Sequence, residues 1–147
     1  MARTYRPTLL GHLRDRMMTF MLSRGIGPPG LYLLTVSGRK TGALRTIPVA
    51  PVEDREGRWL VAPFGPDGWA RNARAAGRVT LSRGRDAVTY TATELGPDEA
   101  APVLKRYLAA HPRTVGAYFD VDKNATVEDF AAEAPRHPAF RLHAAGT

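Results

Sequence analysis

The chain of 147 residues contains no cysteine and no long apolar run. The lack of cysteine excludes disulfide bonds, thiolate metal sites and cysteine nucleophiles. No stretch approaches the ~20 apolar residues that a transmembrane helix needs. Residues 1–7 are basic, but no clean apolar run with a small-residue cleavage site follows them, so the sequence predicts no signal peptide. The default expectation is a cytoplasmic protein.

Side chains suited to catalysis are scarce. The histidines are His12, His111, His137 and His143; none lies four residues from another and no HExxH pattern occurs, so no metal site is predicted. No GxSxG motif is present. The carboxylates concentrate in turns and at helix starts, where capping and solubility account for them. An enzyme with so few reactive side chains would need a cofactor to supply the reactive groups.

Acidic residues are missing from two blocks, residues 16–52 and 68–85. Those blocks hold ten of the 21 basic residues, while the rest of the chain carries 11 basic and 14 acidic residues. Because the net charge of +7 is concentrated in this way, an anionic partner is favoured: a nucleic acid, a phospholipid surface or a polyanionic small molecule. The alternative is a solvated basic face in an arginine-rich protein.

The central feature is residues 31–50, which read as a strand, a basic loop and a second strand. The loop holds Arg39, Lys40 and Thr41 between Gly38 and Gly42, and Arg45 opens the second strand, expected to run to residue 52. Glycines let backbone N–H groups turn toward a ligand, and the cations and hydroxyl suit a phosphate or carboxylate. The alternative is a β-hairpin whose turn happens to be basic. The spacing matches neither a Walker A loop nor a dinucleotide fingerprint.

Residues 9–24 predict an amphipathic helix with Thr8 as its N-cap. Its apolar face comprises Leu9, Leu10, Leu13, Met17, Phe20 and Met21. Two interpretations compete. The helix packs on the sheet, which is the favoured interpretation, or it is a basic amphipathic helix that touches a membrane.

The middle of the chain predicts a third strand and a short helix. Residues 53–57 form a charged turn before a strand at 58–64, so three consecutive strands predict an antiparallel meander. A turn-rich stretch leads into a helix at 69–76, which Asp67 is placed to cap and Gly77 ends. Trp69 and Asn72 share a face of this helix, where Asn72 either ties down a neighbouring loop or contacts a ligand.

The remaining elements complete one domain of mainly β, α+β class with flanking helices. Residues 78–83 and 86–94 form a hairpin around Gly84, and helices are expected at 97–111 and 126–133, the latter with a capping box. A last strand is expected at 139–143. We divide the single domain 1–147 into an N-terminal helix and linker (1–28), a barrel core (29–95), and C-terminal helices with the last strand (96–147).

Three blocks in this order, LLTVSGRKTGALRTIPV, WLVAPFG and WARNARAAGRVTL, resemble the deazaflavin-dependent nitroreductase family. The resemblance covers about residues 30–95, with weaker likeness to the end, including HPAFRL. It implies an antiparallel, FMN-binding-like split β-barrel that binds coenzyme F420, a deazaflavin with a phosphate and an oligoglutamate tail. It also implies hydride transfer from the reduced cofactor to quinones, nitro compounds or activated alkenes.

The resemblance also assigns roles to residues. Arg39, Lys40, Thr41 and Arg45, with Gly42 in the turn, would hold the phosphate and glutamates. The backbone at Ala62, Pro63, Phe64 and Gly65 would face the deazaflavin ring, and Trp69 and Asn72 would hold the ring or its ribityl chain. Tyr118 would donate a proton or shape the pocket, with Tyr107 as the less favoured choice.

Several alternatives stay open at this point. FMN would make the protein a reductase or oxidase of the same fold, although one phosphate needs less positive charge. A non-catalytic cofactor carrier or a membrane-surface protein is a different class. Nucleic-acid binding is disfavoured, since neither interleaved exposed aromatics nor a helix-turn-helix is recognisable. A homodimer is an option, because a small barrel leaves strand edges to cover.

Overall fold

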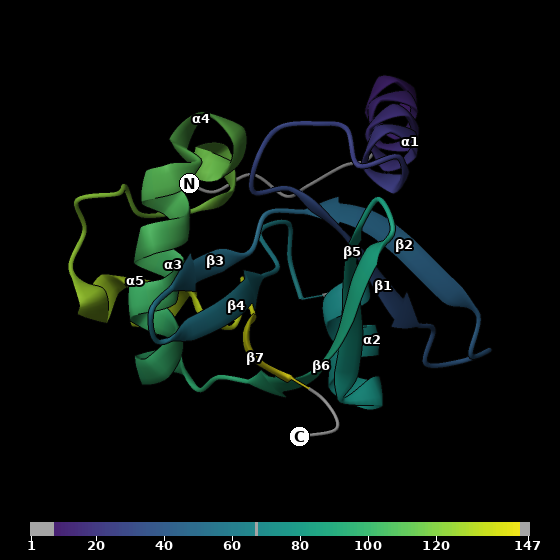
Figure 1. The fold of residues 1–147 in the computed structure, drawn as a ribbon. Coiled ribbons are helices and arrows are strands. Elements are labelled where there is room, and N and C mark those ends of the chain that lie inside the picture. Colours follow the sequence, from purple (N-terminus) through teal and green to yellow (C-terminus); the bar gives the residue numbers. More distant parts are fainter. Residues whose placement is uncertain (1–7, 67, 145–147) are drawn as a thin grey trace.

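A computed structural model describes residues 8–66 and 68–144 and shows a single antiparallel sheet that curls into a half-barrel flanked by helices (Figure 1). The strands are β1 (Tyr32–Ser37), β2 (Leu44–Val49), β3 (Val52–Asp54), β4 (Gly57–Val61), β5 (Arg78–Arg83), β6 (Asp86–Glu94) and β7 (Ala139–Ala144). They lie in the order β2-β1-β5-β6-β7-β4-β3. This confirms the predicted antiparallel, mainly β class.

The helices are α1 (Leu9–Ser23), α2 (Trp69–Ala76), α3 (Pro97–Ala110), α4 (Pro112–Val115) and α5 (Val127–Glu133), with a 3₁₀ turn η1 (Gly116–Tyr118). Local signals account for their ends. Gly77 closes α2 with φ +71°, and Thr126 and Asp129 form the predicted capping box at α5. The predicted cap Asp67 lies outside the described residues, and Gly68 occupies the N-cap position of α2.

The predicted meander is wrong. β1 pairs with β2 and β3 pairs with β4, but β2 and β3 lie at opposite edges of the sheet. The strand expected at residues 45–52 is therefore two strands, separated at Ala50 and Pro51, and the strand expected to reach residue 64 ends at Val61. Proline lacks the N–H that a central ladder needs, so Pro48 and Pro51 fit an edge strand and a break. The hairpin of β5 and β6 has the predicted bounds.

Two hydrophobic clusters share β4 between them, because alternate side chains of a strand point to opposite faces. Leu60 belongs to the barrel interior, together with Leu34, Val79 and Phe140. Trp59 and Val61 face the other way and pack with α3 and α5, which lie side by side against this part of the sheet (Figure 1). The barrel and the C-terminal helices thus form one connected structure.

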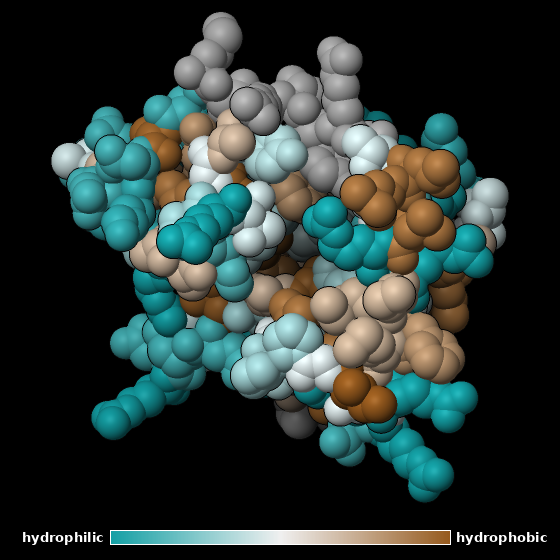
Figure 2. Space-filling view, turned by 90° about the horizontal axis from the view of Figure 1, so that it is seen from above, coloured by the Kyte–Doolittle hydropathy of each residue, from teal (hydrophilic) through white to brown (hydrophobic). Residues whose placement is uncertain are grey.

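The favoured interpretation of α1, that its apolar face packs on the sheet, is wrong. Leu9 is 78% exposed and Phe20 is 61% exposed, and Leu10, Leu13 and Met17 are exposed as well. Figure 1 shows α1 standing above the sheet, and Figure 2 shows hydrophobic side chains gathered at its position. Leu22 is the residue of α1 that is fully buried.

The attachment of α1 to the barrel is close and local. The amide of Gly84, in the β5–β6 turn, donates to the carbonyl of Leu22 at 2.8 Å. A Cβ built on Gly84 would lie 3.2 Å from the Cα of Gly25, and Gly84 has φ +60°. Glycine is needed there because the two backbones touch. The C-terminal turn of α1 is anchored in this way, and its apolar row projects from the barrel.

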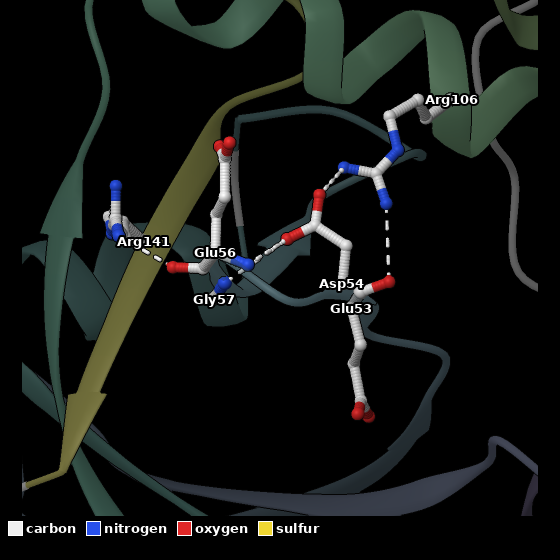
Figure 3. A network of polar contacts seen from close by, with 6 residues as sticks. All are labelled: Glu53, Asp54, Glu56, Gly57, Arg106 and Arg141. Atoms are coloured by element: carbon white, nitrogen blue, oxygen red, sulfur yellow. Dashed lines mark hydrogen bonds and ion pairs between the residues drawn. The ribbon is translucent and has the colours of Figure 1, made fainter.

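The turn between β3 and β4 is tied to α3 and β7 (Figure 3). The Asp54 carboxylate accepts hydrogen bonds from the backbone N–H groups of Glu56 and Gly57, and the Glu56 N–H in particular holds the pKa of Asp54 below its usual range. Arg106 of α3 donates to Asp54 at 2.8 Å, and Arg141 of β7 donates to the Glu56 carbonyl at 2.9 Å. This end of the barrel is therefore closed by polar contacts.

Within residues 8–66 and 68–144, no helix combines the length and the apolar character needed to cross a bilayer.

Candidate functional site

The antiparallel order brings several of the sequence-predicted residues to one end of the barrel. Between β1 and β4 the sheet has four antiparallel pairings: β1 with β5, β5 with β6, β6 with β7, and β7 with β4. Each pairing reverses the strand direction, so β1 and β4 run in the same direction. The loop after β1, residues 38–43, and the segment after β4, residues 62–65, therefore leave the sheet at the same end. The β3–β4 turn lies at the other end.

The basic loop is held in shape by its own backbone. The Gly38 N–H donates to the Ala43 carbonyl at 2.7 Å, and the Gly42 N–H donates to the Gly38 carbonyl at 2.9 Å. Thr41 Oγ1 accepts a hydrogen bond from the Ala43 N–H at 3.2 Å. Gly42 has φ +75°, a conformation that side chains other than glycine rarely adopt. The loop is a tight turn with a defined geometry.

Asn72 connects this loop to α2. Its Oδ1 accepts hydrogen bonds from the backbone N of Arg39 at 3.1 Å and from Arg39 Nη1 at 2.9 Å. Asn72 is 4% exposed, so its amide needs such partners. Of the two predicted roles, the one that ties down a neighbouring loop is confirmed.

Thr41 and Arg45 flank Gly38, where the Ala43 carbonyl oxygen lies 3.2 Å from the position that a Cβ would take. A Cβ built there would lie 3.7 Å from Thr41 Oγ1 and 3.8 Å from Arg45 Nε. Arg39, Lys40 and Arg45 are exposed, and no described carboxylate forms an ion pair with any of them. Unpaired cations beside a glycine turn leave room for an anion.

The segment after β4 presents backbone to open space. Ala62 is buried and its N–H donates to the Pro138 carbonyl at 2.9 Å, whereas Pro63 is half-buried and Phe64 is exposed. Gly65 has φ +124°, and a Cβ built on it would meet no atom within 4 Å. Among the described residues, no atom occupies the space on the Cβ side of Gly65, which leaves its backbone accessible there.

Trp69 and Tyr118 border this segment. The indole of Trp69 packs on Phe140 of β7, with ring centroids 5.7 Å apart, so it belongs partly to the barrel core. The ring of Tyr118, in η1, meets Phe64 edge to face at 5.1 Å. Phe64 and Tyr118 come from segments more than fifty positions apart, and their two rings form an aromatic wall at residues 62–65.

Tyr107, the less favoured tyrosine, is a core residue of α3. It is 7% exposed, and burial raises its pKa to about 12. Its ring contacts His111 at 4.8 Å and is surrounded by the helical cluster. Tyr107 therefore belongs to the packing of the C-terminal helices, and Tyr118 is the tyrosine beside residues 62–65.

Sequence reasoning gave no role to Phe119 and His137, which stack behind Tyr118 with ring centroids 3.9 Å apart. Their only signal in the sequence was the HPAFRL block, and nothing local linked it to residue 119. Among the described residues, no three His, Asp or Glu side chains gather in a way that could hold a metal ion. The arrangement can bind an anion and a planar group side by side, and it offers few acid or base groups.

Solved structures share this architecture. The chain is similar to a structure described as an F420-H2-dependent reductase (FDR-A), with 24% identity, 78% of this chain and 95% of that chain covered, and a TM-score of 0.54. It is also similar to a protein described as a domain-swapped dimer, with 22% identity over 92% and 100% of the chains and a TM-score of 0.57. The heme storage protein HutZ from Vibrio cholerae matches at 11% identity, 90% and 89% coverage and a TM-score of 0.55. At these identities the matches show the fold, which confirms the predicted split barrel.

A family model decides the relationship. The model described as F420H(2)-dependent quinone reductase matches residues 16–128, which is more than half of the chain. The match spans the basic loop, the segment after β4, α2 and Tyr118. The chain therefore belongs to the F420H2-dependent quinone reductase family, and it is an oxidoreductase that uses coenzyme F420.

Proposed function

We propose that this protein reduces a quinone, or another electrophilic acceptor such as a nitro compound or activated alkene, at the barrel end formed by residues 38–45, 62–72 and 118. The observation that carries the proposal is a tight glycine turn whose three cations, Arg39, Lys40 and Arg45, are exposed and have no carboxylate partner among the described residues, at the same end of the barrel as residues 62–65. When bound, the reduced deazaflavin supplies a hydride. The chain's own residues then have to bind the coenzyme, orient the acceptor beside it and deliver a proton to the reduced acceptor.

The basic loop suits the phosphate and glutamates of the coenzyme. Arg39, Lys40 and Arg45 are exposed and unpaired among the described residues, so they offer full positive charge to an acidic tail. The Thr41 hydroxyl accepts one hydrogen bond and keeps its own proton for a phosphate oxygen. Gly42, with φ +75°, allows the tight turn that keeps these groups close together in the loop.

The segment after β4 suits the ring. We assign Ala62, Pro63, Phe64 and Gly65 to the surface that the deazaflavin faces, because Gly65 leaves its backbone uncovered. Trp69 and Asn72 would border the ring or the ribityl chain. Asn72 also acts through Arg39, since its oxygen is already occupied by two donors.

The acceptor would lie against Phe64 and Tyr118. Hydride addition to a quinone leaves negative charge on an oxygen, and Tyr118 Oη is the described hydroxyl next to residues 62–65 that suits delivery of a proton there. Most of the rate enhancement would come from holding the acceptor in place.

A titration tests the proposal. Full-length protein is titrated with F420 and, separately, with FMN, and binding is followed by fluorescence. We expect micromolar or tighter binding of F420 and weaker binding of FMN, followed by quinone-dependent oxidation of F420H2. Micromolar binding of FMN without binding of F420 would contradict the proposal.

Two charge-removing variants test whether the basic loop binds the acidic tail of F420. Arg45→Gln and Lys40→Gln should each raise the Kd for F420 about threefold to tenfold, as expected for the loss of one charge-assisted contact. The control is Arg55→Gln, an exposed arginine in the turn at the other end of the barrel, which should leave the Kd unchanged. Equal effects of all three variants would show a nonspecific response to net charge.

Two interactions with larger partners are also proposed. The exposed apolar row of α1 and its flanking arginines support contact with an anionic lipid surface, which co-sedimentation with phosphatidylglycerol vesicles tests against a Leu13→Gln/Met17→Gln variant. The edge strands β2 and β3 support a homodimer, which light scattering in solution tests.

A further inference from the structure

His137 is a buried histidine without a role in the function proposed above. It is 3% exposed, and neither Nδ1 nor Nε2 has a hydrogen-bond partner among the described residues. It lies in the connection between α5 and β7, where its backbone N–H is shared between the carbonyls of Glu133 and Ala134. Buried polar atoms without partners are unfavourable and rare, so a histidine kept at this position calls for an explanation.

The imidazole lies between the two segments that form the aromatic wall. It stacks flat on Phe119, with an interplanar angle of 12°. Phe119 directly follows Tyr118, whose ring meets Phe64. On the other side, the residue after His137 accepts the backbone hydrogen bond from Ala62. His137 therefore links the two segments: its ring contacts Phe119, and the backbone beside it holds Ala62.

Backbone carbonyl groups surround the ring. Burial lowers the pKa of His137, whereas the carbonyls of Pro63, Tyr118 and Ala62 are close enough to favour its protonated form. A neutral imidazole has one N–H to donate, and these carbonyls are the acceptors at hand. A phenylalanine would stack on Phe119 equally well, but only the imidazole offers a donor. These carbonyls lie near the ring without meeting full hydrogen-bond geometry, so the contacts are longer or less well aligned than regular hydrogen bonds.

The neighbours of His137 brace the same segment. Glu133 is 1% exposed, accepts a hydrogen bond from the Asp120 N–H at 2.7 Å and forms an ion pair with Arg136. Arg136 also pairs with the Asp120 carboxylate at 2.6 Å. The end of α5 thus fixes the chain just after Phe119, which leaves the side that faces residues 62–65 to His137.

We propose that His137 is a positioning residue for the reduction: its ring N–H is donated to the backbone carbonyls around it and holds Tyr118 and residues 62–65 in one relative geometry. The inference rests on the proposed function, because it takes residues 62–65 as the surface that faces the coenzyme. His137 acts through the backbone and contacts neither coenzyme nor acceptor.

The test compares His137→Phe, which keeps the stack and removes the donor, with His137→Gln, which keeps a donor and removes the stack. Hydrogen exchange of the ligand-free proteins measures the amides around residues 62–65 and 118–120. Steady-state kinetics with F420H2 and a soluble naphthoquinone measure kcat and KM separately. The matched control is His111→Phe, a partly buried histidine that packs on Tyr107 instead.

We expect His137→Phe to keep the wild-type melting temperature, to exchange severalfold faster in both segments, and to lose about tenfold in kcat with KM changed less than about twofold, as for lost orientation. His137→Gln should recover part of the kcat. His111→Phe should behave as wild type in both segments and in kcat. Wild-type exchange and kcat in His137→Phe, or a lower melting temperature with unchanged kcat, would overturn the proposal.

The exchange measurement separates this proposal from the function on which it rests. If wild-type protein binds no F420, the proposed function fails, and the kinetics say nothing about His137. Faster exchange in ligand-free His137→Phe would still support the bracing of the two segments. Unchanged exchange would overturn it, whatever the activity.

Discussion

Asn72 Oδ1 accepts two hydrogen bonds from one residue, Arg39, through its backbone N at 3.1 Å and its Nη1 at 2.9 Å. A buried amide on α2 therefore fixes both the path of the basic loop and the direction of its first cation. The loop and the helix are more than thirty positions apart in sequence. The orientation of the proposed anion site thus depends on a contact outside the loop itself.

Asn72→Ala should weaken both folding and the binding of F420. It leaves the Arg39 N–H and guanidinium without their acceptor, so we expect a loss of about 1–3 kcal/mol in unfolding free energy, as for hydrogen bonds to charged groups. The Kd for F420 should rise about tenfold, because Arg39 loses its fixed direction. Urea unfolding and fluorescence titration measure the two effects.

Asn124→Ala is the matched control for that variant, since Asn124 is an exposed asparagine in a loop away from α2. It should change neither quantity. An unchanged Kd in Asn72→Ala, with only stability reduced, would show that the loop binds without this support.

Stability should fall between pH 7.5 and pH 5.5 through two histidines, the partly buried His111 and the buried His137. Burial lowers the pKa of both His111 and His137 below the ordinary value of 6.5. The unfolded chain therefore binds more protons in this range, and the free energy of unfolding falls as the pH falls through 6.5 toward the lower folded-state values. Urea unfolding at several pH values measures the slope.

Replacing either histidine should flatten that slope. His111→Gln and His137→Phe should each lose part of the pH dependence, whereas His12→Gln, at an exposed position of α1, should keep it. A slope that stays the same in both the His111 and the His137 variants would contradict the assignment of the pH dependence to these two side chains. Work above pH 5 avoids the titration of Asp54, whose pKa lies below 3.8.

The exposed row of α1 should contribute little to folding. Leu13→Gln combined with Met17→Gln should change the unfolding free energy by less than about 0.5 kcal/mol, since both side chains are exposed. Leu22→Ala should cost about 2–5 kcal/mol, because Leu22 is fully buried. Chemical unfolding of the two proteins under the same conditions makes the comparison. A large loss in the double variant would show that the row packs on the protein.

Phe140 and Phe64 should differ sharply although both lie near the same end of the barrel. Phe140 is fully buried against Trp69, so Phe140→Ala should cost about 3–5 kcal/mol of unfolding free energy. Phe64 is 44% exposed, so Phe64→Ala should cost less than about 1 kcal/mol and should instead raise KM for the quinone. Equal losses of unfolding free energy in Phe140→Ala and Phe64→Ala would contradict the assignment of Phe140 to the core and of Phe64 to the aromatic wall.

Local chemistry was enough to predict much of this protein. The cap at Gly77, the capping box at α5 and the hairpin around Gly84 depend on neighbouring residues, so their bounds follow from the chain itself. The GRKTG loop and the blocks after it pointed to the family before any strand was paired. The cations at Arg39, Lys40 and Arg45 were recognised for the same reason.

Pairing over long distances was decided only by the tertiary structure. The hydrophobic pattern predicts one strand over residues 45–52, but it cannot say that this stretch forms β2 and β3 at opposite edges of the sheet, because the strands β5 and β7 that separate them come later in the chain. The apolar face of α1 likewise predicts burial, yet none of the described elements covers it, since the helix attaches through Leu22 at one end. The contacts of Asn72 with Arg39 and of His137 with Phe119 join distant segments, and side-chain packing across the folded barrel alone determines them.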